Sequence, residues 1–187
     1  MGLRNVGCLN PARFEAGGSI YNRLVTFPPP EIPLREARPR DFAELWALDR
    51  RCFVPEIAYT RAELHKVMQE PEAFTLVAQR ASGPILAFLV GALDARRRGH
   101  VITIDVLPDS RRCGLGGRLI RAAEERWRNV GVREVRLEVA VNNHAALAFY
   151  ARFGYRILNR LPDYYPGGLD GLLLEKPLLP SRDRAST

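Results

Sequence analysis

Near the middle of the 187-residue chain, one continuous segment reads Val101-Ile-Thr-Ile-Asp-Val-Leu-Pro-Asp-Ser-Arg-Arg-Cys-Gly-Leu-Gly-Gly-Arg-Leu-Ile120. Its first part, residues 101–106, is an apolar, β-branched run that predicts a buried strand. Pro108 ends the strand because proline has no N–H for a strand ladder. From Leu119 to Trp127, apolar side chains recur at helical spacing. The segment is therefore a strand, an Arg/Gly loop and the beginning of a helix.

This combination predicts a site for an anion. Glycines let backbone N–H groups approach a ligand, the helix dipole favours negative charge, and Arg111 and Arg112 add positive charge. We expect the ligand to carry phosphates. The loop lacks the Gly-Lys-Ser/Thr of a P-loop, and Leu119 stands where a dinucleotide-binding fingerprint has its third glycine.

The spacing Arg111-x-x-Gly114-x-Gly116 resembles the acyl-CoA pyrophosphate loop of the GCN5-related N-acetyltransferases (GNATs). The alternative is an ordinary glycine-rich turn with solvated arginines. A second segment, Glu138-Val-Ala-Val-Asn-Asn-His-Ala-Ala-Leu-Ala-Phe-Tyr-Ala-Arg-Phe-Gly-Tyr155, resembles the family signature E-V-x-x-x-N-x-x-A-x-x-F/L-Y-x-x-x-G-F/Y. With the later Asp163-Tyr-Tyr-Pro166 loop, the resemblance is to the RimI-type protein N-terminal acetyltransferases and covers about residues 32 to 178.

The rest of the chain predicts the remaining elements. Strands are expected over 32–37, 74–79, 85–93, 134–141, 155–159 and 172–175, the last two flanking a loop over 163–168. Helices are expected from about Asp41, after the capping box Thr60-Arg-Ala-Glu63, and from Asn142 or Asn143 to about Phe153. The order β-α-α-β-β-β-α-β-α-β-β predicts an α/β fold with a mixed central sheet and helices on both faces, which is also the order of the GNAT fold.

Composition places a single globular domain between two tails. Hydrophobic residues make up 47% of the chain and charged residues 26%, which is ordinary for a globular domain. Residues 1–30 are expected to form a flexible tail that ends in three prolines, residues 31–178 the domain, and residues 179–187 a polar tail. No apolar run approaches the roughly 20 residues of a membrane helix, so no membrane partner is expected.

Charge and cysteine content exclude several classes of function. The net charge is +7 and all but two of the 28 basic residues are arginine, but they are scattered and show no interleaving with aromatic residues, so nucleic-acid binding is not expected. The one compact run is Arg96-Arg97-Arg98. Three widely spaced cysteines favour neither a disulfide framework nor a zinc site, and a reducing cytoplasm is the expected compartment. The three histidines show no metal-ligand spacing, so no metal is expected.

The family resemblance implies acetyl-CoA as co-substrate and assigns residues to it. Backbone groups near Val106 and the side chain of Asn143 are implied to contact the pantetheine arm. The pyrophosphate is implied to lie on Arg111, Arg112, Gly114, Leu115, Gly116 and Gly117. Tyr150 is implied as the general acid at the sulfur and Glu138 as the general base, because the amine must lose a proton and the leaving thiolate must gain one.

Each of these residues also has a structural interpretation. Asn143 could serve only as a helix N-cap, Tyr150 as a core residue, and Glu138 as the exposed face of a strand. His100 is a second candidate base. Three further residues are candidates for the acceptor side, Asp105 by binding an ammonium and the two tyrosines by closing over a peptide N-terminus, although each could be an ordinary surface residue: Asp105, Tyr164 and Tyr165.

We therefore predict an acyltransferase that moves an acetyl group from acetyl-CoA to a primary amine, with the α-amino group of a protein N-terminus as the favoured acceptor. Residues 53–60, on the expected acceptor side, match no pattern that excludes a small-molecule amine or an antibiotic as the acceptor. A non-catalytic acyl-CoA-binding module is the alternative from another class, although Glu138 and Tyr150 are both present. The sequence does not distinguish a monomer from a homodimer.

Overall fold

The computed structural model describes residues 32–178, except residues 56 and 82. The expectations for the two tails, residues 1–30 and 179–187, therefore lie outside the described residues. Within them, the strands are β1 (Leu34–Glu36), β2 (Phe74–Gln79), β3 (Ile85–Leu93), β4 (Gly99–Val106), β5 (Glu134–Ala140), β6 (Arg156–Tyr165) and β7 (Leu169–Pro177). The helices are α1 (Phe42–Cys52), α2 (Arg61–Met68), α3 (Leu115–Asn129) and α4 (His144–Arg152).

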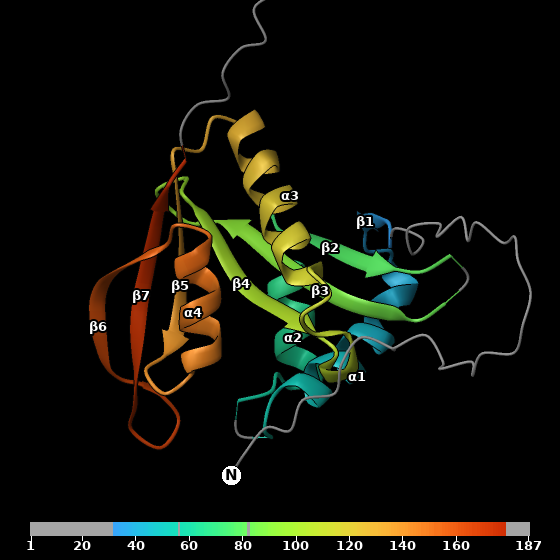
Figure 1. Cartoon of the computed structure of the whole chain (residues 1–187), viewed down its shortest axis with the longest axis horizontal. Helices are drawn as coiled ribbons and strands as arrows, with labels where there is room; N and C mark the ends of the chain where they lie inside the picture. Colours follow the sequence, from blue (N-terminus) through green and yellow to red (C-terminus); the bar gives the residue numbers. More distant parts are fainter. Residues whose placement is uncertain (1–31, 56, 82, 179–187) are drawn as a thin grey trace, which may run out of the picture.

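The seven strands form one mixed sheet in the order β1-β2-β3-β4-β5-β7-β6. All neighbours are antiparallel except β4 and β5, which are parallel and are connected through α3. Helices α3 and α4 cover one face of the sheet, and α1 and α2 cover the other (Figure 1). The predicted α/β fold, its element order and the parallel connection are confirmed.

Each face of the sheet has its own hydrophobic core. The core under α3 and α4 includes Leu89, Val101, Leu119 and Trp127, and the core under α1 and α2 includes Leu45, Leu64, Val77 and Phe88. The apolar residues that recur at helical spacing in the sequence therefore form the buried faces of these helices. The capping box also forms as predicted, because Glu63 N–H donates to Thr60 Oγ1 at 3.2 Å and Thr60 N–H donates to Glu63 Oε2 at 2.9 Å.

One extra residue in β4 changes the direction of the side chains after it. The partner of Val90 is Thr103 and the partner of Gly91 is Val101, so Ile102 is a β-bulge. Val101 and Ile104 pack on the α3 side, whereas Ile102 packs on the α1 side. A bulge of one residue reverses the alternation of the strand, and the residues after Ile102 face the opposite way from an unbroken pattern.

The last two strands are longer than the sequence predicts. Tyr164 and Tyr165 belong to β6, and only a short turn separates β6 from β7. The prediction ended the first of these strands at Asn159 and gave residues 163–168 to a loop, whereas in the structure the strand continues through Pro162, a residue that normally breaks strands. In the structure β6 is the last strand of the sheet, where proline is tolerated, and two register shifts accommodate the irregular segment. In the described part of the chain, no helix is long and apolar enough to cross a membrane.

Helix α3 packs on the sheet through the Trp127 ring, which lies against two glycines, Gly91 and Gly99. Trp127 is 1% exposed, and a Cβ atom at Gly91 would lie 2.8 Å from both the Trp127 ring and the Phe74 ring. A Cβ atom at Gly99 would also lie 2.8 Å from the Trp127 ring. The two glycines are therefore required by packing, since neither has a positive φ.

We expect the Gly91→Ala substitution to destabilise the domain by about 1–3 kcal/mol, the usual cost of an extra methyl group in a packed core. Urea denaturation followed by tryptophan fluorescence measures the change in the free energy of unfolding. Combining it with Phe74→Leu should recover part of the loss, because one of the two clashing rings is then smaller. An unchanged free energy of unfolding for Gly91→Ala would show that Trp127 does not define the position of α3.

Candidate active site

The parallel strands β4 and β5 pair only at their beginnings. Gly99 is opposite Val135 and His100 is opposite Arg136, and no later residue of β4 has a partner in β5. Figure 1 shows the two strands diverging from this end of the sheet. The backbone of residues 101–106 therefore presents an edge inside the sheet, and buried backbone polar groups need hydrogen-bond partners. Val106, implied to lie beside the pantetheine arm, is the last residue of this edge.

The Arg/Gly loop follows directly from that edge. A short 3-10 helix, Pro108–Ser110, leads to Arg111, Arg112 and Gly114, and α3 begins at Leu115. Gly114 is the N-cap with a φ of 80° and no side-chain cap, so its conformation favours glycine. The N–H groups in the first turn of α3 have no partner within the helix, and this terminus carries the positive end of the helix dipole.

The two glycines inside α3 have a second reason to be there. A Cβ atom at Gly116 would lie 3.3 Å from the Phe149 ring, and one at Gly117 would lie 2.7 Å from the Phe153 ring. Both aromatic rings belong to or directly follow α4. From the sequence these glycines were expected to serve ligand approach alone, whereas in the structure they also allow α3 and α4 to come together. Gly114 has no atom within 4 Å of its Cβ position, and only its backbone conformation requires glycine.

Two polar side chains of the predicted cofactor site have partners within the protein. Arg111 folds back so that its Nε donates to the Val106 carbonyl at 3.1 Å. The Asn143 side chain accepts from Ala146 N–H at 3.1 Å and caps α4, as its structural interpretation required. The Asn143 side-chain oxygen makes this bond, and its amide N–H groups are the donors for any ligand contact. Arg112 has a φ of 64°, an uncommon conformation for a residue other than glycine.

The two candidate bases form a pair at the point where β4 and β5 separate. His100 Nε2 lies 2.8 Å from Glu138 Oε2, with side chains 34% and 21% exposed. Burial by itself lowers the pKa of His100, but the hydrogen bond and the charge of Glu138 outweigh burial, so the pKa lies above its usual value. The strand register explains the contact, because His100 is opposite Arg136 and Glu138 is two residues further along the same face of β5.

Tyr150 lies in the interior, on α4. It is 5% exposed and its ring packs edge-on against Phe149 and Tyr155, with centroid distances of 5.1 Å and 5.4 Å. Burial raises the pKa of its phenol well above the usual value, and the charge of Asp105 raises it further. The phenol therefore keeps its proton, which is the state that a general acid requires. Its packing also satisfies the structural interpretation of Tyr150 as a core residue.

The candidates for the acceptor side divide into surface and interior residues. Tyr164 is half exposed, and its ring lies edge-on to Tyr165 at 5.0 Å. Burial raises the pKa of Tyr165 to about 12, and the nearby charges of Tyr164 and Glu138 contribute, which places this pair near Glu138. Asp105 is 1% exposed and lies beside Asp49 of α1, so the structure places it inside the domain.

Sequence reasoning missed two residues of this region, Asp49 and Tyr59. Asp49 lies on the apolar stripe of α1, four residues after Leu45 and three before Cys52, and it is completely buried. A carboxyl group within an apolar stripe is the sequence feature that could have identified Asp49. Tyr59 precedes the capping box of α2 and no local pattern distinguishes it. Its phenol interacts electrostatically with Asp49, Asp105, Tyr164 and Tyr165.

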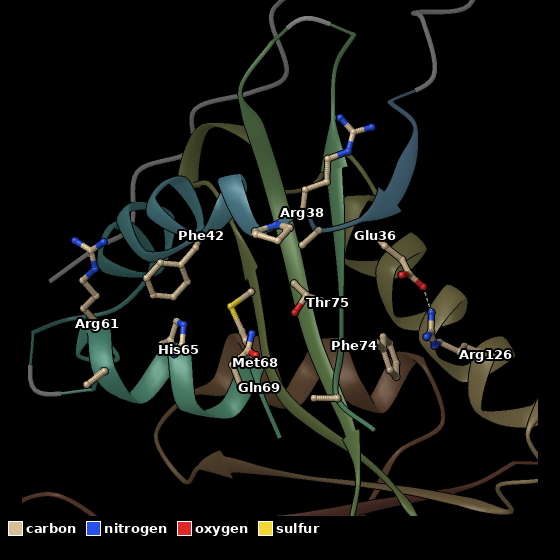
Figure 2. Close-up of a pocket in the computed structure, with 14 residues that line it drawn as sticks. Glu36, Arg38, Phe42, Arg61, His65, Met68, Gln69, Phe74, Thr75 and Arg126 are labelled. Carbon is tan, nitrogen blue, oxygen red and sulfur yellow. Dashed lines mark hydrogen bonds and ion pairs between the residues drawn. The ribbon is translucent and has the colours of Figure 1, made fainter. Parts of the chain in front are cut away.

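A separate groove of about 860 Å³ lies between α1, α2, β2 and the C-terminal half of α3 (Figure 2). Phe42, Met68 and Phe74 line it, and Arg126 on its rim pairs with Glu36. None of the predicted site residues lines this groove, so it is distinct from the candidate active site. Among the described residues, no group of three or more histidine, cysteine, aspartate or glutamate side chains could hold a metal ion.

Comparisons with known proteins identify relatives of this arrangement. The family model described as "Acetyltransferase (GNAT) family" matches residues 40–155. An N-alpha-acetyltransferase of Sulfurisphaera tokodaii is 28% identical over 160 residues, 79% of this chain and 94% of the relative. Among solved structures, the ribosomal-protein-S18-alanine N-acetyltransferase of Escherichia coli has a TM-score of 0.71 at 20% identity, over 83% of this chain and 99% of that one. Naa20 of Chaetomium thermophilum, in complex with a bisubstrate analogue, has a TM-score of 0.68 at 25% identity, over 79% and 87%.

We expect the Glu138→Gln substitution to lower the pKa of His100, because the carboxylate that stabilises the imidazolium is removed. Nuclear magnetic resonance of the imidazole C–H signals of the three histidines measures this directly. The stabilising effect of the pair is complete below the unfolded pKa of about 6.5 and is lost as the pH rises through the higher folded value.

The matched control is Glu175→Gln, which removes a carboxylate of the same sheet whose partner is Arg136 at 2.6 Å. The pKa of His100 should change little in this variant. An unchanged pKa of His100 in Glu138→Gln would contradict the pairing.

Proposed function

The chain belongs to the GNAT acetyltransferase family, and on that basis we propose that it transfers an acetyl group from acetyl-CoA to the α-amino group of a protein N-terminus. Membership makes the protein an acyltransferase that uses acetyl-CoA. The N-alpha-acetyltransferase relative, matched over 94% of its length, supports a protein N-terminus as the acceptor. The observation that carries the proposal is the half-buried His100–Glu138 pair beside the unpaired edge of β4.

The residues present are suited to hold acetyl-CoA between β4, the loop and α4. The unpaired backbone up to Val106 offers hydrogen bonds to an extended amide-bearing arm. The first-turn N–H groups of α3, with Leu115, Gly116 and Gly117, and the charges of Arg111 and Arg112 offer counter-charge to a pyrophosphate. Asn143 retains its amide donors for the same arm. Bound there, acetyl-CoA supplies the acetyl thioester that the amine attacks.

The chain's own side chains would move the two protons of the reaction. An α-ammonium must become an amine before it can attack, and the His100–Glu138 pair accepts that proton, with Glu138 stabilising the imidazolium as a carboxylate does in hydrolase triads. Tyr150, whose phenol stays protonated, donates a proton to the leaving thiolate. Tyr164 and Tyr165 close over the peptide. Asp105, which is 1% exposed, supports the acceptor side from within the domain.

We further propose that residues 31–178 are the catalytic unit. The family match falls within this range, and its first residues are tied to α3 because Arg118 donates to the Ile32 carbonyl at 2.7 Å. The tails on either side would then be dispensable for acetyl transfer.

The acceptor can be identified by incubating the protein with acetyl-CoA and a panel of N-terminal peptides and small amines, while free thiol release is followed. We expect peptides with a free α-amino group to release thiol, and the same peptides with a blocked N-terminus to release none. Release only with small amines would overturn the proposed acceptor. Tight acetyl-CoA binding without release for any acceptor would favour a binding module.

We expect Tyr150→Phe to lower kcat by roughly 10²–10⁴-fold, the typical contribution of general acid catalysis, with little change in acetyl-CoA affinity. Tyr155→Phe is the matched control, because it removes a buried hydroxyl from the neighbouring ring of the same aromatic cluster. Its kcat should stay close to that of the unmodified protein. Normal turnover of Tyr150→Phe would exclude the acid role, and loss of folding would assign Tyr150 to the core.

A further inference from the structure

Two carboxyl groups, those of Asp49 and Asp105, are buried against each other. Asp49 is 0% exposed and Asp105 is 1% exposed. Each carboxyl group acts on the pKa of the other, and Asp49 Oδ1 and Asp105 Oδ2 are buried without a hydrogen-bond partner among the described residues. Ionised carboxylates are acceptors only. A proton bound by the pair would supply the donor that these two oxygens lack.

The remaining oxygens of the pair connect it to two separate parts of the chain. Tyr59 N–H donates to Asp49 Oδ2 at 2.9 Å, and the Thr103 hydroxyl donates to Asp105 Oδ1 at 2.9 Å. The Tyr59 carbonyl in turn accepts from the indole N–H of Trp46 at 3.1 Å. The pair therefore fastens the segment before α2 to β4, through α1.

The bulge in β4 creates this contact. Ile102 is the extra residue, so the side chains after it face the opposite way from an unbroken strand. Without the bulge, Asp105 would point toward α3 with Val101, and Asp49 would have no partner.

Few charges face the pair from the surrounding elements. The groups that interact with it are Cys52 of α1, Tyr59, Arg111 of the loop and Tyr150 of α4. Arg111 is the cation among them, and its side chain is exposed and bonded to the Val106 carbonyl. Two buried like charges without a cation between them are costly. Burial raises the pKa of both carboxyl groups, and the charge of Asp49 raises that of Asp105 further.

The fastened segment belongs to the acceptor side of the active site. The Tyr59 phenol interacts electrostatically with the phenols of Tyr164 and Tyr165, and Glu138 acts on both of those tyrosines. The pair itself acts on Tyr150 through Asp105. Any movement of the Tyr59 segment would therefore change the surface that receives the acceptor.

We propose that Asp49 and Asp105 are positioning residues, which share one proton to hold the Tyr59 segment on β4 and loosen it as the pH rises. This inference rests on the proposed function for its effect on catalysis, but the link between the segment and the shared proton does not.

The pH dependence follows from the number of protons bound. The closed segment holds one proton between the carboxyl groups, and in the opened segment both carboxyl groups have pKa values near 4 and bind none. The link is therefore complete below about pH 4 and weakens by about tenfold per pH unit above it. The weakening stops at the raised pKa of the closed pair, where both states have lost the proton.

Hydrogen exchange of the intact protein, measured between about pH 5 and 9 and corrected for intrinsic exchange, tests this without any acceptor. We expect the protection factor of residues 57–60 to fall about tenfold per pH unit over the lower part of the range, while β3 stays protected. In Asp105→Asn the amide can donate to Asp49 at every pH, so the protection factor should fall less steeply with pH than in the unmodified protein. The reverse variant, Asp49→Asn, should behave in the same way.

The matched control is Asp109→Asn, since the side chain of Asp109 is 79% exposed. This variant should keep the pH dependence of the unmodified protein. With an acceptor peptide in hand, KM for the peptide should rise with pH in the unmodified protein and rise less in Asp105→Asn, while KM for acetyl-CoA is unaffected. A protection factor of the unmodified protein that does not fall with pH would overturn the proposal, even if neither asparagine variant folds. A fall in the two asparagine variants as steep as in the unmodified protein would also overturn it. Failure of acetyl transfer alone would count against the proposed function and not against the shared proton.

Discussion

The divergence of β4 from β5 after their first two residues is the constraint on which the rest of the structure depends. A parallel pair normally continues its ladder, and stopping it leaves the backbone of residues 101–106 with an unpaired edge inside the sheet. Buried N–H and C=O groups of this kind need partners. The same divergence directs the end of β4 to the Arg/Gly loop and brings α3 and α4 together on one face, through the close approach of Gly116 to Phe149. A site for an extended, phosphate-bearing ligand is thereby part of the sheet itself.

On the opposite face of the sheet, the register and the bulge of β4 position the side chains of the proposed acceptor side. At the point of divergence, the register places His100 next to Glu138. Two residues after His100, the bulge at Ile102 turns Asp105 toward α1. The strand β4 thus contributes its backbone edge and one member of each pair, His100 and Asp105. The phenol of Tyr59 interacts electrostatically with Asp49 and Asp105, and those of Tyr164 and Tyr165 interact with Glu138.

The sequence was sufficient for the parts of the fold that depend on local patterns. β-branched runs, the capping box before Arg61 and the Arg/Gly loop are properties of contiguous residues, and β2, β3 and α3 lie where they were predicted. It was insufficient where two distant segments meet. The extension of β6 through Pro162 depends on its being an edge strand, the need for Gly117 depends on the Phe153 ring, and the contact of Asp49 with Asp105 depends on a bulge. No single segment contains those relationships.

The His100–Glu138 pair and the Asp49–Asp105 pair differ in burial and in chemistry. His100 and Glu138 are partly exposed, so a proton gained by the imidazole is stabilised by the carboxylate and can return to solvent. Asp49 and Asp105 have like charges and no exposed surface, so their proton is retained because losing it would leave two carboxylates in contact. In the proposed function, the first arrangement exchanges a proton with an amine in each reaction cycle. The second keeps its proton until the pH rises, and its proposed contribution is to hold Tyr59 in place. A carboxyl group beside a partly exposed histidine is suited to moving protons, and a buried carboxyl group beside another carboxyl group is suited to maintaining structure. The difference comes from burial and from the charge of the neighbouring group, and not from the type of carboxyl residue.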